Sequence, residues 1–90
     1  MILETQPIPL RIDKYGVLRV GGTRLTVDLV IEAFNRGDSP QEIVDQFPVV
    51  TLADVYGVIA YYLAHKDQLD AYLSERETAA QELQRDIEEG

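Results

Sequence analysis

Cysteine and tryptophan are absent from this 90-residue chain, and histidine occurs once. Without cysteine there can be no disulfide framework and no thiolate metal site. The single histidine, His65, has no second histidine with which to share a metal ion, so no metal site is expected. No serine lies in a recognisable nucleophile motif. We therefore expect no catalytic residues, no cofactor and no enzymatic activity.

Long apolar runs are also lacking. The longest, residues 58–64, is far shorter than the roughly 20 residues that span a bilayer. The N-terminus does not have the basic start and apolar stretch of a leader sequence. We expect a soluble, cytoplasmic protein without a membrane partner. A domain of this size buries only about 60–65% of the surface that its unfolded chain exposes, so a thin stability margin favours an oligomer or a partner.

Positive charge is scarce, because 8 lysines and arginines face 16 aspartates and glutamates, for a net charge of −8. Residues 1–50 carry five basic and seven acidic groups (−2), and residues 51–90 carry three and nine (−6). Only the first 25 residues have more cations than acids. Arg11, Arg19 and Arg24 are therefore the candidates for contacting DNA. So few cations would bind phosphates only weakly and would lose affinity steeply with salt.

A β-hairpin is predicted over residues 8–20. Ile8, Leu10 and Ile12 alternate with polar or proline positions, and a second apolar stretch follows the Gly-containing turn at residues 13–16. Prolines at positions 7 and 9 cannot donate to a strand ladder, so the first strand should be short.

Helices are predicted over residues 27–36, 40–47 and 52–65, with a further helix over much of 67–88. Apolar residues recur there at spacings of three and four. The sequence does not decide whether this last helix is separate or continues the one before it, and a bend near residues 66–67 is the favoured interpretation. Thr26, Ser39 and Thr51 are the expected N-caps, and Gly37 is the expected end of the first helix. The expected core positions are Val30, Ile31, Phe34, Ile43, Phe47, Val55 and Ile59.

The predicted fold is therefore mostly α: a short N-terminal β-hairpin, a three-helix core resembling a helix-turn-helix, and a C-terminal amphipathic helix. Residues 1–66 would form the hairpin and core, and residues 67–90 an acidic tail for partner binding or oligomerisation. Because the tail's apolar seam has no remaining core to cover, a homodimer is expected. The partner-binding candidates are the apolar Leu69, Tyr72, Leu83 and Ile87 and the acidic Glu75 and Glu82.

The helix at residues 52–65 would be the DNA-reading element of a helix-turn-helix. It contains no Arg, Lys, Asn or Gln, which are the residues that usually read base edges. Direct readout of a DNA sequence by this helix is therefore not expected.

Several short motifs together carry a resemblance to a known family. They are Gly22-Thr23-Arg24, Thr26-Val27, Gly37-x-Ser39-Pro40-x-Glu42, Phe47-Pro48, and Leu52-Ala53-Asp54-Val55 leading to Tyr61-Tyr62. In this order they resemble the bacterial domain-of-unknown-function family 433, over about residues 16–66. The resemblance implies a homeodomain-like helical fold. It also implies the role of an antitoxin in a type II toxin-antitoxin pair, whose partner is a toxin resembling PIN-domain ribonucleases, with weak DNA binding for autoregulation.

An alternative from another functional class stays open. The chain could be a homo-oligomeric scaffold or regulatory domain without a toxin, stabilised by its own tail pairing with a second copy. The neighbouring gene discriminates between the two, because a small toxin-like reading frame beside this one supports the antitoxin.

Overall fold

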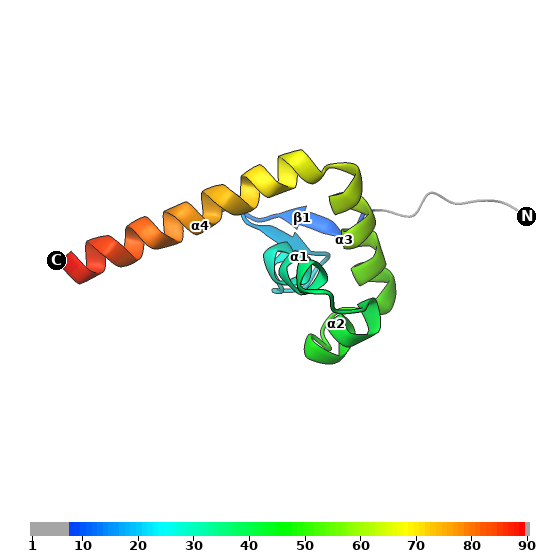
Figure 1. The fold of residues 1–90 in the computed structure, drawn as a ribbon. Coiled ribbons are helices and arrows are strands. Elements are labelled where there is room, and N and C mark those ends of the chain that lie inside the picture. Colours follow the sequence, from blue (N-terminus) through cyan, green and yellow to red (C-terminus); the bar gives the residue numbers. More distant parts are fainter. Residues whose placement is uncertain (1–7, 90) are drawn as a thin grey trace, which may run out of the picture.

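The computed structural model describes the backbone of residues 8–89 and the side chains of residues 8–80. The prediction of a mostly helical chain with a short N-terminal hairpin is confirmed (Figure 1). The elements are β1 (Leu10–Ile12), β2 (Leu18–Val20), α1 (Val27–Arg36), α2 (Pro40–Gln46), α3 (Leu52–Ala64) and α4 (Lys66–Glu89).

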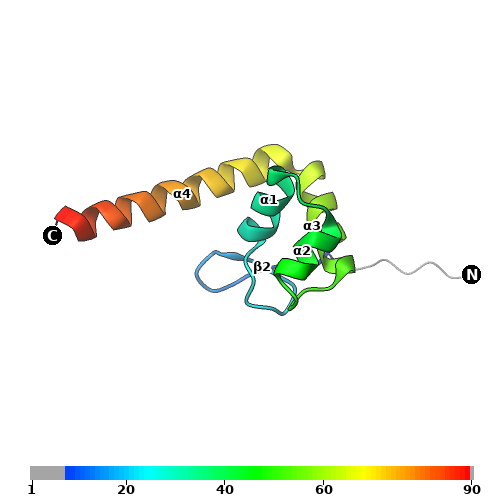
Figure 2. The same ribbon diagram turned by 60° about the horizontal axis from the view of Figure 1, so that its bottom comes forward.

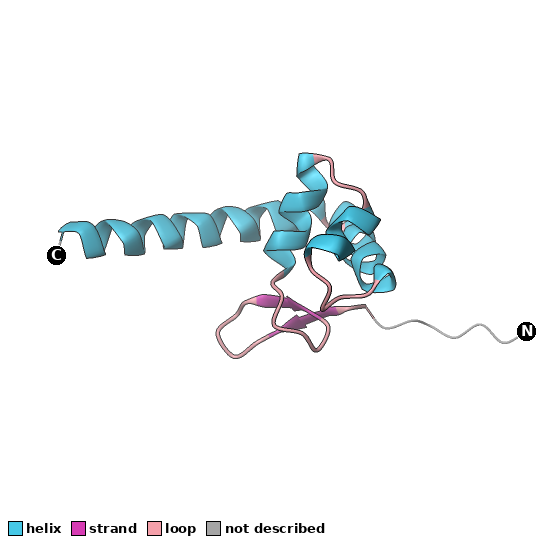
Figure 3. Ribbon diagram, turned by 90° about the horizontal axis from the view of Figure 1, so that it is seen from below, coloured by secondary structure: helices cyan, strands magenta, loops and turns pink. Residues whose placement is uncertain are grey.

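The hairpin forms because a single aspartate closes its turn. Strands β1 and β2 pair antiparallel, with Leu10 opposite Val20. Asp13 Oδ1 accepts hydrogen bonds from the N–H groups of Tyr15 (2.8 Å) and Val17 (3.0 Å). Gly16 takes the left-handed conformation (φ 80°) that the tight turn requires and that glycine adopts without strain. The hairpin lies as a separate layer against the helices (Figure 3).

The helix ends follow the capping signals, with one difference. Ser39 with Glu42 and Thr51 with Asp54 form complete capping boxes at the starts of α2 and α3. Gly37 (φ 103°) ends α1 in the left-handed conformation. Thr26 is the N-cap of α1 as predicted, but its side chain makes no capping hydrogen bond. Its extended backbone instead forms a β-bridge with Arg19, so this residue continues the sheet.

The core lies where α1, α2 and α3 meet over β2. Five of the seven predicted core positions, Val30, Ile31, Ile43, Val55 and Ile59, are buried as expected. The other two, Phe34 and Phe47, are only partly buried and pack against the edge of the core. The core gains residues that were not on the expected list, namely Val20, Val27, Ala33, Val50, Val58, Tyr62 and Leu69.

Helix α4 is separate from α3, which decides a point that the sequence left open. His65 ends α3, and α4 starts at the next residue with a change of direction (Figures 1 and 2). The first part of α4 passes beside the body, and its C-terminal part extends away from the other elements. Among the described residues, no helix combines the length and apolar character needed to cross a bilayer.

Candidate macromolecule-binding surfaces

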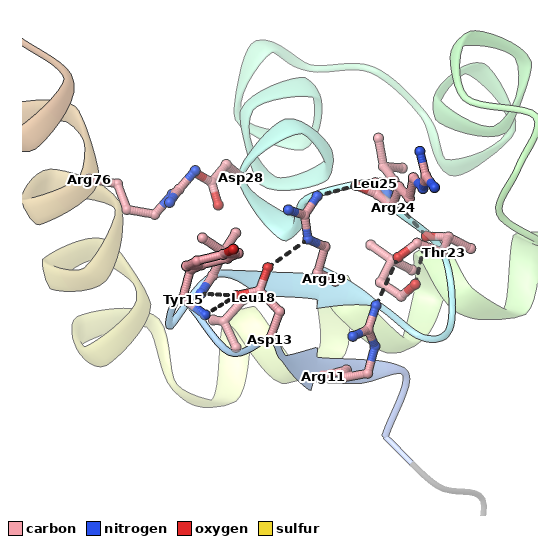
Figure 4. Close-up of polar contacts among 12 residues, drawn as sticks. Arg11, Asp13, Tyr15, Leu18, Arg19, Thr23, Arg24, Leu25, Asp28 and Arg76 are labelled. Carbon is pink, nitrogen blue, oxygen red and sulfur yellow. Dashed lines mark hydrogen bonds and ion pairs between the residues drawn. The ribbon is translucent and has the colours of Figure 1, made fainter.

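A hollow on the hairpin gathers the cations of the first 25 residues. It is lined by Arg11, Asp13, Lys14, Tyr15, Arg19 and Arg24, and we call it the cationic hollow. The three arginines that sequence analysis selected as DNA-binding candidates therefore lie together (Figure 4). They come from β1, from β2 and from the loop that joins β2 to α1.

Backbone carbonyls hold two of these guanidinium groups in place. Arg11 donates to the carbonyl oxygens of Gly21 (3.0 Å) and Thr23 (3.3 Å). Arg19 donates from Nε to Asp13 Oδ2 (3.1 Å) and from Nη1 to the carbonyl oxygen of Arg24. Both side chains are therefore oriented before any ligand arrives, which lowers the entropy cost of binding. Arg24 is exposed.

The charge balance of the cationic hollow is positive. Arg11 stands directly opposite Arg19 in the β-ladder, and like charges in that position destabilise a hairpin. Asp13 neutralises only Arg19. The N–H group of Val17 contributes most to lowering the pKa of the Asp13 carboxyl, and the N–H group of Tyr15 and the guanidinium of Arg19 add to that effect. Asp13 therefore stays ionised. Because it is the one carboxylate among the described residues that lines the hollow, the charges of Arg11, Lys14 and Arg24 are not neutralised by the lining.

The first half of α4 is fastened to the body by polar contacts. Tyr72 Oη accepts a hydrogen bond from the N–H group of Leu18 in β2 (2.8 Å). Arg76 Nε donates to Asp28 Oδ2 in the first turn of α1. Asp28 Oδ1 is buried and has no hydrogen-bond partner among the described residues, so burying this carboxylate costs free energy. The ion pair with Arg76 opposes that cost.

A second polar cluster joins α1, α3 and α4 at the bend. Tyr62 Oη donates to Asp70 Oδ1 (2.7 Å) and accepts from Asn35 Nδ2 (3.3 Å). Lys66 Nζ lies 3.1 Å from Asp70 Oδ2. The hydroxyl of Tyr62, followed by Lys66, lowers the pKa of the Asp70 carboxyl. This cluster therefore ties the start of α4 to both α1 and α3.

These contacts correct two of the predicted partner-binding residues. Leu69, which was expected to anchor a partner, is 5% exposed and belongs to the core. Tyr72 is half-buried and is used by the chain's own hairpin. The reason is that the start of α4 folds back over the body, so its seam is covered from within. Glu75 is exposed, as a partner-binding residue must be, whereas Glu82, Leu83 and Ile87 lie outside the described side chains.

Three residues of these surfaces were not among the predicted candidates. Lys14 and Tyr15 line the cationic hollow, and the Lys14 ammonium lies 5.1 Å from the centre of the Tyr15 ring. Their position in a turn between two cationic strands was the available signal. Arg76 occupies a position of the apolar stripe of the last helix, which marks it as unusual, but the sequence does not reveal that its partner is Asp28.

Within the part of the chain that the structure describes, no group of three or more His, Asp or Glu side chains gathers in a way that could hold a metal ion.

Comparison with known families gives one match. The model of the family described as "Protein of unknown function (DUF433)" matches residues 15–62, which run from the hairpin turn almost to the end of α3. Helix α4 lies outside the matched segment. No curated protein and no solved structure matches the chain.

Proposed function

The chain belongs to the DUF433 family, and from this premise we propose that it is a cytoplasmic antitoxin that neutralises a PIN-like ribonuclease toxin by protein-protein binding. The body of the protein would hold α4 in place, and the C-terminal part of α4 would contact the toxin. The observation that carries the proposal is this projecting helix (Figure 1).

The C-terminal part of α4 extends away from the other elements (Figure 1). Arg76 is held to α1 through Asp28, and the side chains of residues 77–80 are all exposed. The remaining stretch, residues 77–89, is about 20 Å long at 1.5 Å per residue. Isolated helices of about 12–15 residues are marginally stable in water. A partner surface would supply the packing that keeps this part of α4 helical.

The charge of this stretch indicates the kind of partner. Residues 77–89 contain five acids and one arginine, for a net charge of −4. A ribonuclease must present cations that hold its RNA substrate, so an acidic helix is complementary to it. Charge complementarity of this kind mainly speeds association, while buried apolar side chains supply most of the affinity and slow dissociation. Leu83 and Ile87 are the apolar residues that the sequence offers for the second role.

Removing residues 81–90 tests the proposal. The shortened chain keeps the Arg76–Asp28 ion pair and the core, so we expect it to fold with an unchanged melting temperature. Its affinity for the product of the neighbouring gene should fall at least about 100-fold, or about 2.7 kcal/mol. The measurement is surface-based binding kinetics at two salt concentrations. A shortened chain that binds this partner as tightly as the full chain would rule out the tail as the neutralising element.

Two full-length variants separate the roles of charge and apolar contact in the same assay. Leu83→Ala with Ile87→Ala should mainly speed dissociation. Replacing Glu75, Glu82 and Asp86 by their amides should mainly slow association and flatten its salt dependence.

The cationic hollow supports a weaker second activity, the binding of DNA phosphates for autoregulation. Arg11 and Arg19 are held side by side although their repulsion costs stability, and local rules of this kind are most often broken at functional sites. The number of cations limits the affinity. Arg11, Lys14 and Arg24 would together release about three counterions, so log K should fall with log salt with a slope near −3.

Neutralising Arg24 tests this activity without disturbing the fold, because the side chain of Arg24 is exposed. Arg24→Gln should lower the affinity for a duplex containing the chain's own promoter and should reduce the salt slope by about one. Lys66→Gln, on α4 and away from the hollow, is the matched control and should change neither quantity. An unchanged slope in Arg24→Gln would exclude the hollow as the phosphate-binding surface.

The scaffold without a toxin remains the alternative. Co-expression with the neighbouring gene product, followed by size-exclusion chromatography, distinguishes the two, because a scaffold elutes without that product.

A further inference from the structure

Helix α3 has an uncharged outer face. All positions of α3 with exposed side chains are apolar, and we call them the α3 face: Leu52, Ala53, Tyr56, Ala60, Leu63 and Ala64. Tyr56 and Leu63 are each 57% exposed, and Leu52 is 40% exposed. Ile8, 58% exposed, lies beside this face and lines the same hollow as Tyr56 and Ala60. Large contiguous apolar patches of this kind usually mark an interaction site on a soluble domain.

The large and the small side chains of the α3 face are separated into two rows. A helix turns about 100° per residue, which places Leu52, Tyr56 and Leu63 within about 40° of one another around the axis. By the same count, Ala53, Ala60 and Ala64 form a second row beside the first. The face is therefore a ridge of large side chains running next to a groove of alanines.

This arrangement is complementary to itself. A two-fold axis parallel to α3 sets the two helices side by side in the same direction. It places the ridge of each helix against the alanine groove of the other, so every contact occurs twice, as an isologous interface requires. An antiparallel pair would instead set ridge against ridge. The shape of the face thus favours a parallel pair of identical helices.

The net charge of the chain also favours a second copy as the partner of the α3 face. The chain has a net charge of −8, so two copies repel one another over most of their surfaces. The six residues of the α3 face carry no charge, and they offer a place where two copies can meet without opposing carboxylates. Burying this face would also enlarge the apolar core of a chain whose small size limits its stability.

We propose that the protein forms a homodimer through the α3 face, with the two α3 helices parallel about a two-fold axis. This inference goes beyond the proposed antitoxin role, because it concerns a surface far from the projecting part of α4. Helix α3 is only about 20 Å long, and a standard interface buries about 800 Å² per partner. The dimer therefore dissociates on dilution. The pairing also covers the helix that would otherwise be the DNA-reading element.

Sedimentation equilibrium of the full chain over a roughly hundredfold range of concentration tests this dimer. The mass should rise with concentration from 10.2 kDa toward twice that value. Tyr56→Glu buries two carboxylates at the interface and should raise the dissociation constant at least about 100-fold. Val49→Glu, at a position 66% exposed and outside the α3 face, is the matched control and should leave the dimer intact. A wild-type chain that stays monomeric, or a dimer that survives Tyr56→Glu, would overturn the proposal.

Because the chain has no cysteine, a single introduced cysteine can form a disulfide only with the same residue of a second copy, which provides a second test. In a parallel pair, the two Leu63 residues lie at the same height on either side of the two-fold axis, so Leu63→Cys should form a disulfide-linked dimer on mild oxidation. In an antiparallel pair the two positions would be about 15 Å apart, beyond the reach of a disulfide. Val49→Cys should stay unlinked under the same conditions. Failure of Leu63→Cys to link would exclude the parallel arrangement. The chain lacking residues 81–90 should still dimerise, which separates this interface from any pairing of the tails.

Discussion

Replacing Tyr62 by alanine is expected to lower the free energy of unfolding by about 3–5 kcal/mol. The Tyr62 side chain is 1% exposed, and its ring meets the edge of the Phe34 ring with centroids 6.2 Å apart. Its hydroxyl also bridges Asn35 on α1 and Asp70 on α4. Alanine would leave a cavity where three helices meet and would break both hydrogen bonds. Urea unfolding of the two chains, followed by circular dichroism, measures this difference.

Tyr62→Phe is the matched variant, because it keeps the ring and removes only the hydroxyl. We expect it to cost about 0.5–1.5 kcal/mol. The Tyr62 hydroxyl is the largest cause of the lowered Asp70 pKa, so this pKa should rise toward its ordinary value in Tyr62→Phe. Carboxyl carbon shifts in an NMR titration report this change. If phenylalanine costs as much as alanine, the ring's packing contributes little and the explanation is wrong.

The helix ends were predictable because local side chains determine them. The capping boxes of α2 and α3 and the glycine that ends α1 are each made by residues within four positions of one another. Such signals can be read without knowing the tertiary structure. The hairpin was predictable for the same reason, since Asp13 closes the turn through its own neighbours.

The choice of buried face was less predictable. Helix α3 is apolar on most of its sides, so spacing alone could not show that Val58 and Tyr62 face the core while Leu52 and Leu63 face solvent. Only the positions of α1 and α2 decide this. Phe34 and Phe47 were expected in the core because they lie on the apolar stripes of their helices, but both lie at its edge. Sequence periodicity identifies apolar positions and does not reveal what covers them.

The candidate surfaces were likewise predictable only where neighbouring residues determine them. Arg11 and Arg19 come together because a short turn sets β1 against β2, and that turn is readable from the sequence. The apolar seam of α4 was also predictable from the sequence, but the surface that covers it was not. A stripe that packs on its own domain and a stripe that packs on a partner follow the same spacing. The ion pair between Arg76 and Asp28 joins residues 48 positions apart, and no local pattern predicts it.

Leu69 provides the sharpest test of which part of α4 belongs to the fold. Leu69→Ala is expected to lower the free energy of unfolding by about 2–5 kcal/mol, because its side chain is 5% exposed and belongs to the core. Leu29→Ala makes the same chemical change at a position 41% exposed and should cost less than about 1 kcal/mol. Both values come from urea unfolding of the full chain.

The shortened chain and Leu69→Ala separate the two parts of α4. Removing residues 81–90 should lower the affinity for the partner at least about 100-fold and leave stability unchanged, whereas Leu69→Ala should lower stability. The partner's affinity for Leu69→Ala should fall only by the fraction of chains that are unfolded. This follows because Leu69 holds the start of α4 against the body and is not available to a partner. If Leu69→Ala unfolds like the wild-type chain but loses the partner, then Leu69 is a partner anchor, and the packing of α4 against the core is not the state that binds.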